Sequence, residues 1–426
     1  MNVNKLKEKA KKITIFLAYN ANIDAIVRIK DLKKIFSKED FKKATATEEK
    51  IKTKQELLAE ILKCMNDGIG REKEITDEIG KWIKENIAPR EKRIGGQIGI
   101  MANALSNLGF KCLVYFPLLS EEQSKFFNRV KNLKFLTKDG WKESGYFFKN
   151  SITKINWIFE FSKGDELFGI KAKENNRFIA ALRPDEDRIK SLLLTEKIEE
   201  INKNSNLAIL SGYHDLKEEY SNSNYIEELS AGEKIIEKLR MPIKLELGHI
   251  SNDKIRKGII EKIAPKADVI SMDTRELESV LELLNKKIKL NDVISYYEAL
   301  KIILESFNLK CVEIHKKDYF LSLVKDYVDL NKIKKGYEIA RDFQYLRSEE
   351  KEISWENLKL VEDKPVSVIG VEAGKKLENY LKNKKNKINA IVVPNKVNPN
   401  PKITVGLGDI VSSISFVIEN IGGIDE

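Results

Sequence analysis

ITVGLGDIVSSISF, residues 403–416, places two glycines and one carboxylate between a β-branched run and a small-residue run of helical character. Gly406 and Gly408 would let backbone amides approach an anion, and a helix beginning near Ile410 would add the positive end of its dipole. Asp409 beside a bound phosphate is unfavourable unless it takes a proton from an attacking hydroxyl. A tight turn with Asp409 as helix N-cap is the alternative, and the local sequence leaves both open.

The composition around this motif is that of a globular protein. The chain has 426 residues, 42% of them hydrophobic and 33% charged, which suffices for a large α/β domain with a smaller one added. The formal net charge of +10 suits nucleic acid or small phosphorylated ligands equally. The lysines, however, alternate with glutamates in helical stretches such as KIKTKQELLAEILK, and no aromatic-interleaved basic module occurs. We therefore expect a solvated basic surface and no nucleic-acid partner.

The cysteines and the apolar runs bear on the cellular compartment. Cys64, Cys112 and Cys311 form no CxxC pair, which favours a reducing compartment and argues against a zinc site. No run approaches eighteen apolar residues, and no apolar segment with a cleavage site follows the basic N-terminus. We expect a cytoplasmic protein without a membrane partner, as a monomer or small homo-oligomer.

Strands and helices alternate over most of the chain. ITIFLAY, residues 13–19, is a strand that stops at the polar cluster NANIDA, and ligands bind at such carboxyl ends in α/β sheets. RIGGQIGIMANALSNLGF, residues 93–110, is a glycine-rich turn feeding a helix that Gly109 would cap. Further strands are predicted in KCLVYFPLL, LAILSGYHD, MPIKLELG, ADVISMD, KCVEIHKKDYFLSLV and NAIVVP. The pattern indicates an α/β domain.

Two other regions depart from this alternation. Residues 30–92 are helix-rich, with a glycine turn in NDGIGRE at 66–72. SGYFFKN, INWIFEFS and ELFGIKA suit antiparallel strands of a smaller sheet. We predict a large domain and a discontinuous lid. The large domain comprises residues 1–23, 93–133 and 186–426, and the lid comprises 24–92 and 134–185.

Six short clusters, read together, resemble one known family. NANIDA, GGQIGIMAN, KENNRFI, KLEL, DTRE and TVGLGD stand in the same order as in the archaeal ADP-dependent sugar kinases, a branch of the ribokinase-like superfamily. The resemblance runs from about residue 14 to 416 and is closest to the phosphofructokinases and phosphofructokinase/glucokinases of methanogens. It implies a three-layer α/β/α large domain with a smaller α+β lid.

The resemblance assigns residues to a sugar site. Asn22 and Asp24 match a pair that bridges sugar hydroxyls, and Glu72 matches an acidic position that contacts glucose. The other matching or neighbouring positions are Gly95, Gly96, Gln97 and Asn156, with Lys154 and Lys171 as candidates for a phosphate on the sugar. The structural alternatives are a helix N-cap for Asp24, a helix-start glutamate for Glu72, a plain turn for the glycines and solvated lysines.

The remaining clusters are assigned to catalysis, nucleotide and metal. Asp409 matches the catalytic base, with the amides around Gly406 and Gly408 as an anion hole for the phosphoryl group. Arg177 matches an arginine that holds the nucleotide phosphates, unless it forms a surface ion pair. Asp273, His315, Val397 and Gly408 are the other nucleotide candidates, and Glu246, Glu276 and Asp409 are the candidates for one magnesium ion. Surface glutamates and a structural histidine are the alternatives.

The chain also departs from the family pattern. It has Lys244-Leu-Glu246 where the family usually has His-x-Glu, and Asp273-Thr-Arg-Glu276 where Asn-x-x-Glu is usual. Both changes keep the glutamate. Lys244 would place a flexible cation near the metal, and an Asp273 carboxylate could bind metal directly. Lys316 stands after His315 where threonine is common, and its role is not evident.

The resemblance implies transfer of the β-phosphoryl group of ADP to a sugar. ADP and Mg²⁺ are the expected donor and cofactor, and no Walker or protein-kinase motif set occurs. Fructose 6-phosphate is the first expected acceptor, with glucose as a second. A glucokinase only, or an inactive nucleotide-binding protein of the same fold, is the alternative, and the intact Asp409 favours the enzyme.

Overall fold

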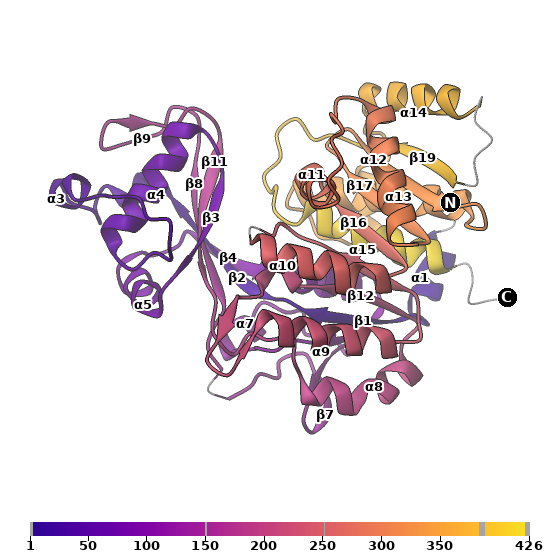
Figure 1. The fold of residues 1–426 in the computed structure, drawn as a ribbon, viewed down its shortest axis with the longest axis horizontal. Coiled ribbons are helices and arrows are strands. Elements are labelled where there is room, and N and C mark those ends of the chain that lie inside the picture. The colour runs from indigo at the N-terminus through magenta and orange to yellow at the C-terminus, as the bar shows by residue number, and fades with distance from the viewer. Residues whose placement is uncertain (1–2, 150, 251, 383–387, 422–426) are drawn as a thin grey trace.

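Two sheets organise the computed structural model, which describes residues 3–149, 151–250, 252–382 and 388–421 (Figure 1). The larger sheet has ten strands in the order β19-β18-β17-β16-β15-β12-β1-β5-β6-β7. Its strands from β17 through β6 are parallel, and those beyond them at either edge are antiparallel. In this spatial order the bounds are Ile388–Pro394, Tyr319–Lys325, Cys311–His315, Val269–Met272, Ile243–Glu246, Leu207–Ser211, Thr14–Tyr19, Lys111–Tyr115, Leu133–Thr137 and Gly140–Glu143.

Helices cover both faces of this sheet and enclose two apolar cores. In β1, Phe16 and Ala18 enter one core while Ile15 and Leu17 enter the other, the alternation of a strand buried on both faces. The first core is closed by α8 (Leu192–Asn204), α9 (Tyr225–Lys238), α11 (Thr274–Leu283), α12 (Val293–Ser306) and α14 (Val368–Leu381). The second is closed by α1 (Val3–Ala10), α6 (Gln97–Asn107), α13 (Leu330–Ser348) and α15 (Leu407–Asn420). The predicted α/β/α layering is confirmed.

A five-stranded sheet forms a smaller domain to one side (Figure 1). Its order is β3-β11-β8-β2-β4, with bounds Arg71–Ile75, Asn176–Leu182, Ile155–Phe161, Asn22–Arg28 and Glu91–Gly95. Helices α2 (Ile29–Leu32), α3 (Lys38–Lys42), α4 (Lys54–Asp67) and α5 (Asp77–Asn86) belong with it. Its own apolar core, between the sheet and these helices, leaves the other face of the sheet toward the large domain (Figure 1).

Short elements complete the fold. They are α7 (Glu121–Ser124), α10 (Asp253–Gly258), a π-helical turn (Ile259–Ile263), 3₁₀ turns (Tyr213–Asp215, Ala264–Lys266, Trp355–Leu360), and the two-residue strands β9 (Glu166–Leu167), β10 (Ile170–Lys171), β13 (Glu219–Tyr220) and β14 (Ser223–Asn224). No helix within the described ranges is long and apolar enough to span a membrane.

The sheets divide the chain differently from the predicted boundaries. β6 and β7 lie in the large sheet, so the second lid segment does not begin at 134, because Leu133–Thr137 continues the parallel order beside β5. The first lid segment is longer than 24–92, since β2 starts at Asn22 and β4 ends at Gly95. SGYFFKN forms an isolated bridge rather than a strand, and its last residue, 150, lies outside the described residues.

Candidate active site

A cavity of about 480 Å³ opens where three adjacent parallel strands end. Glu246 is the last residue of β15, Asp273 follows β16, and His315 ends β17. The carboxyl ends of parallel strands meet at one edge, so these side chains converge. The predicted site residues that line the cavity are Gln97, Glu246, Asp273, Glu276, His315, Val397, Gly408 and Asp409.

The glycine motif forms the start of helix α15. The helix begins at Leu407, three residues earlier than predicted, and no strand precedes it, because residues 401–404 run as irregular chain. Gly406 is the N-cap with φ 81°. Asp409 is therefore in the first helical turn and is not the cap. A Cβ on Gly408 would meet nothing within 4 Å. Glycine at 408 thus serves no packing need and keeps the amide groups open to the cavity.

Three carboxyl groups, of buried Glu246 and of half-buried Glu276 and Asp409, line this cavity without a basic partner among the described residues. Glu246, Glu276 and Asp409 form no ion pair with any described residue. Burial, then the charges of Glu246 and Asp24, raises the pKa of Asp409 to about 7. Burial also raises the pKa of Glu246 to about 7 and that of Glu276 well above its usual value. Like charges buried together hold protons until a cation neutralises them.

The donor set fits magnesium bound largely through water. The described residues contain no group of three or more His, Cys, Asp or Glu side chains arranged to hold a metal directly. Magnesium keeps several waters and shares substrate phosphates, so it needs oxygen donors rather than a closed protein cage. Glu246 and Glu276 supply such oxygens at the cavity wall.

Lys244 does not reach the cavity as the sequence suggested. Its side chain is fully buried, with Nζ 2.5 Å from Glu313 Oε2 and donating to the carbonyl oxygen of Ser412 at 2.8 Å. Burial alone would lower the pKa of Lys244, but the charges of Glu313 and Glu246 outweigh it and raise the pKa. Ser412 in turn donates its hydroxyl to Glu246. Lys244 therefore ties β15 and β17 to helix α15 beneath the site.

Asp273 caps the helix that carries Glu276. Its Oδ1 accepts from the backbone N–H of Glu276 at 2.8 Å, and the Glu276 carboxylate accepts from the N–H of Asp273 at 2.8 Å. This reciprocal capping box fixes both carboxylates at the start of α11. The Asp273 substitution thus keeps a local structural role that asparagine also fills.

Asn22 and Asp24 form a buried pair at the start of β2. The Asn22 amide donates to Asp24 Oδ1 at 2.8 Å, and burial raises the pKa of Asp24 to about 6. Gly95 lies against them: its Cβ would stand 2.6 Å from the Asn22 amide nitrogen. Gly96, at φ 73°, would place a Cβ 2.7 Å from the Ala21 Cα. Both glycines are therefore required by close approach, and Asp24 is a strand residue rather than a helix cap.

Strand register places the other predicted sugar and phosphate residues on one face of the small sheet. Asn156 is paired with Asp24, and Glu72 and Arg177 have the same side-chain direction. Their strand neighbours, such as Trp157 and Phe178, enter the core on the opposite face. The polar face therefore points to the large domain. Asn156 Oδ1 is buried with no hydrogen-bond partner among the described residues.

The two predicted phosphate lysines differ from this arrangement. Lys154 is 1% exposed, and its ammonium lies 2.5 Å from Asp187 and 2.7 Å from Asp215. Lys171 is 72% exposed on the β9–β10 hairpin, at the tip of the small domain (Figure 1). The structure does not bring Lys171 to the cavity, and Lys154 is already neutralised by carboxylates.

His315 and Lys316 end β17 at the cavity wall. His315 Nε2 lies 3.4 Å from both Ser271 Oγ and Tyr337 Oη. Burial, then the Lys244 charge, holds the pKa of His315 well below its usual value, so the ring is neutral. The Lys316 ammonium lies 3.7 Å from the centre of the Tyr296 ring. This cation–π contact gives Lys316, whose role was not evident from the sequence, a structural partner.

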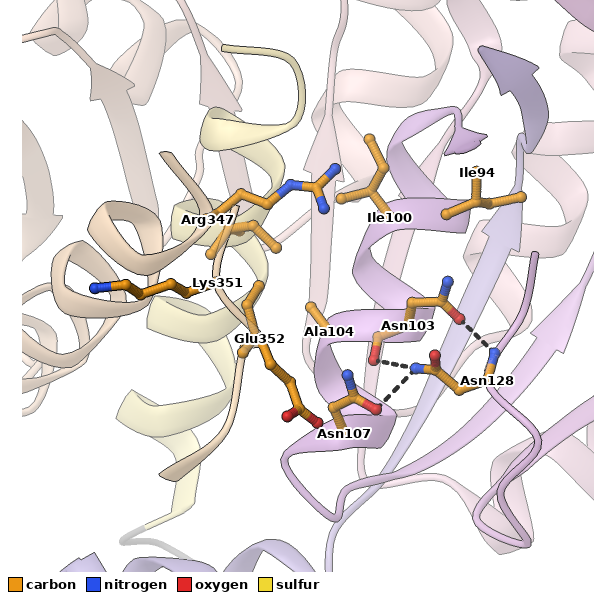
Figure 2. A pocket seen from close by; sticks show the side chains of 11 residues that line it. Ile94, Ile100, Asn103, Ala104, Asn107, Asn128, Arg347, Lys351 and Glu352 are labelled. Atoms are coloured by element: carbon orange, nitrogen blue, oxygen red, sulfur yellow. Dashed lines mark hydrogen bonds between the residues drawn. The ribbon is translucent and has the colours of Figure 1, made fainter. Parts of the chain in front are cut away.

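Several site residues were not predicted from the sequence. Gln344, Asn395 and Lys396 line the same cavity. Arg347, in the last turn of α13, extends across a second cavity of about 180 Å³ toward Ile100 on α6 (Figure 2). A basic residue in a last turn ordinarily indicates only a favourable interaction with the helix dipole, so the sequence carried no signal for it.

Comparison with known proteins places this geometry in a family. Residues 13–418 match the conserved region of the ADP-specific phosphofructokinase/glucokinase family. The ADP-specific phosphofructokinase of Methanosarcina acetivorans is 30% identical over 95% of this chain and 92% of that protein. Among solved structures, the last common ancestor of ADP-dependent phosphofructokinases from Methanosarcinales has TM-score 0.85, with 30% identity over 98% of this chain and 96% of that one.

A second solved structure is described as an ADP-dependent kinase in complex with fructose-6-phosphate and ADPβS. It has TM-score 0.85 and 29% identity over 100% of this chain and 97% of that one. The family match spans the cavity, the glycine motif and both sheets. The chain therefore belongs to the ADP-specific phosphofructokinase/glucokinase family.

Proposed function

We propose that this protein transfers the β-phosphoryl group of ADP to fructose 6-phosphate, giving fructose 1,6-bisphosphate and AMP. The observation that carries this proposal is the position of Asp409, half-buried in the first turn of α15 beside open backbone amides and within electrostatic reach of Asp24. The family match, and the related structure described with fructose-6-phosphate and ADPβS, support the donor and the acceptor.

In the proposed step, the sugar hydroxyl oxygen attacks the β-phosphorus in line with the bond to the α-phosphate. The new oxygen–phosphorus bond forms as the bridging bond breaks, the hydroxyl proton passes to the Asp409 carboxylate, and AMP leaves. The amides around Gly406 and Gly408 donate to the phosphoryl oxygens. Asn22 and Asp24 hold neighbouring sugar hydroxyls, and Arg177 on the small sheet draws the nucleotide phosphates toward them.

Glu246 and Glu276 are the residues that would hold Mg²⁺, largely through its waters. When bound, the ion neutralises charge on the phosphates during transfer. The protein's part is to keep both carboxylates in place: Ser412 donates to Glu246, and the capping box orients Glu276. The small domain acts as a lid whose polar face closes over the substrates and excludes water.

Glucose is the second acceptor that the site supports. The family description includes glucokinases, and Glu72 lies on the cleft-facing side of the small sheet. We also propose that the enzyme is cytoplasmic, which its three free, buried cysteines support, and that it is a monomer or small homo-oligomer. An inactive nucleotide-binding protein remains the second candidate because Lys244 and Asp273 replace the usual residues.

The test crosses ADP and ATP with fructose 6-phosphate and glucose in a coupled assay, with Asp409→Asn as the matched control. Turnover with ADP, absent in the variant, supports the proposal, and a higher kcat/KM for fructose 6-phosphate supports the acceptor. No turnover in any combination, together with an ADP-induced rise in Tm, would instead establish the nucleotide-binding protein.

A further inference from the structure

Arg347 and Arg93, called the arginine pair below, lie beside the proposed sugar site from opposite domains. Arg93 is on β4, directly opposite Asp24 in the strand register. Arg347 comes from the end of α13 and lines a cavity with Ile94, which precedes Gly95, and with Ile410, which follows Asp409. Figure 2 shows its guanidinium extended toward Ile100, inward from the surface occupied by Lys351 and Glu352.

Neither guanidinium has a good acceptor. The Nε atoms of Arg93 and Arg347 are buried and have no hydrogen-bond partner among the described residues. The Arg93 side chain is 14% exposed, and within the described part of the chain it has a single ion-pair contact, with Glu91 at 3.8 Å. The Arg347 side chain forms no hydrogen bond or ion pair with any described residue. Guanidinium groups present five fixed donors, so the pair leaves unused donors next to the site.

Such an arrangement is unfavourable in the free protein. A buried donor without an acceptor is destabilising, and more so when the group is charged. Burial lowers the pKa of Arg347, and the nearby charge of Arg93 lowers it further. Asp409 and Asp24 act on Arg347 through space but do not contact it. An anion that reaches both guanidiniums would relieve the repulsion and satisfy the donors.

We propose that the arginine pair binds phosphate oxygens of a substrate at the Asp24–Asp409 site. The inference rests on the proposed function, which brings a phosphate group to this point between two carboxylates. Asp24 and Asp409 repel such a group, so cations on the same side are needed to hold it. A planar, permanently charged fork suits that task, and Arg347 and Arg93 approach from the large and small domains respectively.

Two sources of phosphate share this chemistry. One is the phosphoryl group in transfer, which either acceptor receives. The other is the phosphate already on fructose 6-phosphate, which glucose lacks. The acceptor used in the assay therefore separates the two sources. If the arginine pair contacts the transferring group, its loss lowers kcat for both acceptors. If the pair contacts the sugar phosphate, its loss raises KM for fructose 6-phosphate only.

The experiment compares Arg347→Gln, Arg347→Lys and Arg93→Gln with the wild-type protein on both acceptors. Lys351→Gln is the matched control, since Lys351 lines the same cavity but is paired with Glu349 at 2.6 Å. We expect kcat/KM for fructose 6-phosphate to fall about 100-fold in Arg347→Gln, with partial recovery in Arg347→Lys and a change of less than about twofold in Lys351→Gln.

Two further readouts separate ligand binding from a structural role. If the arginine pair is a binding site for an anion, Arg347→Gln should leave the Tm of the ligand-free protein unchanged or raise it. The same variant should reduce the Tm rise produced by fructose 6-phosphate or inorganic phosphate. A fall in Tm that accounts for the lost activity, or unchanged kinetics on both acceptors, would overturn the proposal. The ligand-induced Tm rise measures anion binding by the arginine pair even if the wild-type protein fails to transfer phosphate. The two proposals can therefore fail independently.

Discussion

One group of charged side chains lies at the junction of the domains and another lines the cavity, and only the first is neutralised by the protein. The interdomain cluster consists of Lys154, Arg183, Asp187, Asp215 and Glu72. Lys154 contacts Asp187 and Asp215, and Arg183 contacts Asp215 at 2.9 Å and also pairs with Glu72. The cavity carboxylates, Glu246, Glu276 and Asp409, have no such partner in the described part of the chain.

Burial opposes the charged form of Asp215 and of Asp409 alike, but the pKa values of these two carboxyl groups move in opposite directions. Burial alone would raise the pKa of Asp215, yet the Arg183 and Lys154 charges outweigh it and hold the pKa well below its usual value. Burial and neighbouring carboxylates raise the pKa of Asp409 to about 7. Desolvation favours the neutral acid unless an opposite charge is close. The interdomain cluster is thus neutralised by its own residues, whereas the cavity carboxylates have no cationic partner among the described residues.

Asp409→Asn is the change with the largest expected effect. We expect kcat with ADP and fructose 6-phosphate to fall at least about 100-fold, because a general base typically contributes that much or more. The free energy of unfolding of the ligand-free protein should rise at pH 8, because the variant removes a buried, unpaired charge. Steady-state kinetics and urea unfolding measure the two effects. Activity within about threefold of wild type would remove Asp409 from the role of base.

Asp215→Asn should have the opposite effect on stability. It leaves Lys154 and Arg183 buried with fewer partners, so the free energy of unfolding should fall by about 3–5 kcal/mol. Asp253→Asn is the control, since the Asp253–Arg256 pair is formed by a carboxylate that is 81% exposed and should contribute less than about 1 kcal/mol. Equal destabilisation by the two variants would contradict the contrast between the two groups.

The Lys244–Glu313 pair lies directly beneath the cavity but should behave like the interdomain cluster. Lys244→Met alone leaves Glu313 unpaired in the core and should lower the free energy of unfolding by about 3 kcal/mol. The double variant Lys244→Met/Glu313→Leu removes both charges and should recover most of that loss. If the two single substitutions lower the free energy of unfolding additively in the double-mutant cycle, Lys244 and Glu313 do not act as a pair in holding α15 against the sheet.

The sequence predicted the strands and helices well where periodicity was strong. Apart from β6, the parallel strands of the large sheet and the helix after the glycine turn at 95–96 lie where expected, because their apolar patterns are long and their turn residues specific. The start of α15 was misplaced because Gly406 can cap a helix by backbone conformation alone, with no side chain to mark it. Residues 134–143, which form most of β6 and all of β7, were assigned to the lid because short strands do not reveal which sheet they join.

Residue roles were harder to predict where they depend on three-dimensional neighbours. Matching clusters predicted roles for Asp24, Glu246 and Asp409, which lie near the start of β2, at the end of β15 and in the first turn of α15. No local pattern could show that Lys244 turns into the core toward Glu313, which is 69 residues away. Arg347 likewise gains its place from the crossing of α13 and α6, since a helix-end arginine is ordinary in sequence.

The smallest expected effect is on the pH dependence of stability in the metal-free protein. Raised pKa values mean that the unfolded chain loses these protons first, so the contribution of Asp24 and Asp409 to stability is complete below about pH 4 and is lost as pH rises toward 6 to 7. Asp215, with its lowered pKa, loses its contribution only as pH falls below about 4. Urea unfolding from pH 4 to 8 should show a decline of about 1–2 kcal/mol in the free energy of unfolding, a small value because the exposed cavity walls reduce the burial penalty. Asp24→Asn should make this decline shallower. Stability that instead rises across this window, with the variant parallel to wild type, would mean that the cavity carboxylates are as well compensated as the interdomain cluster.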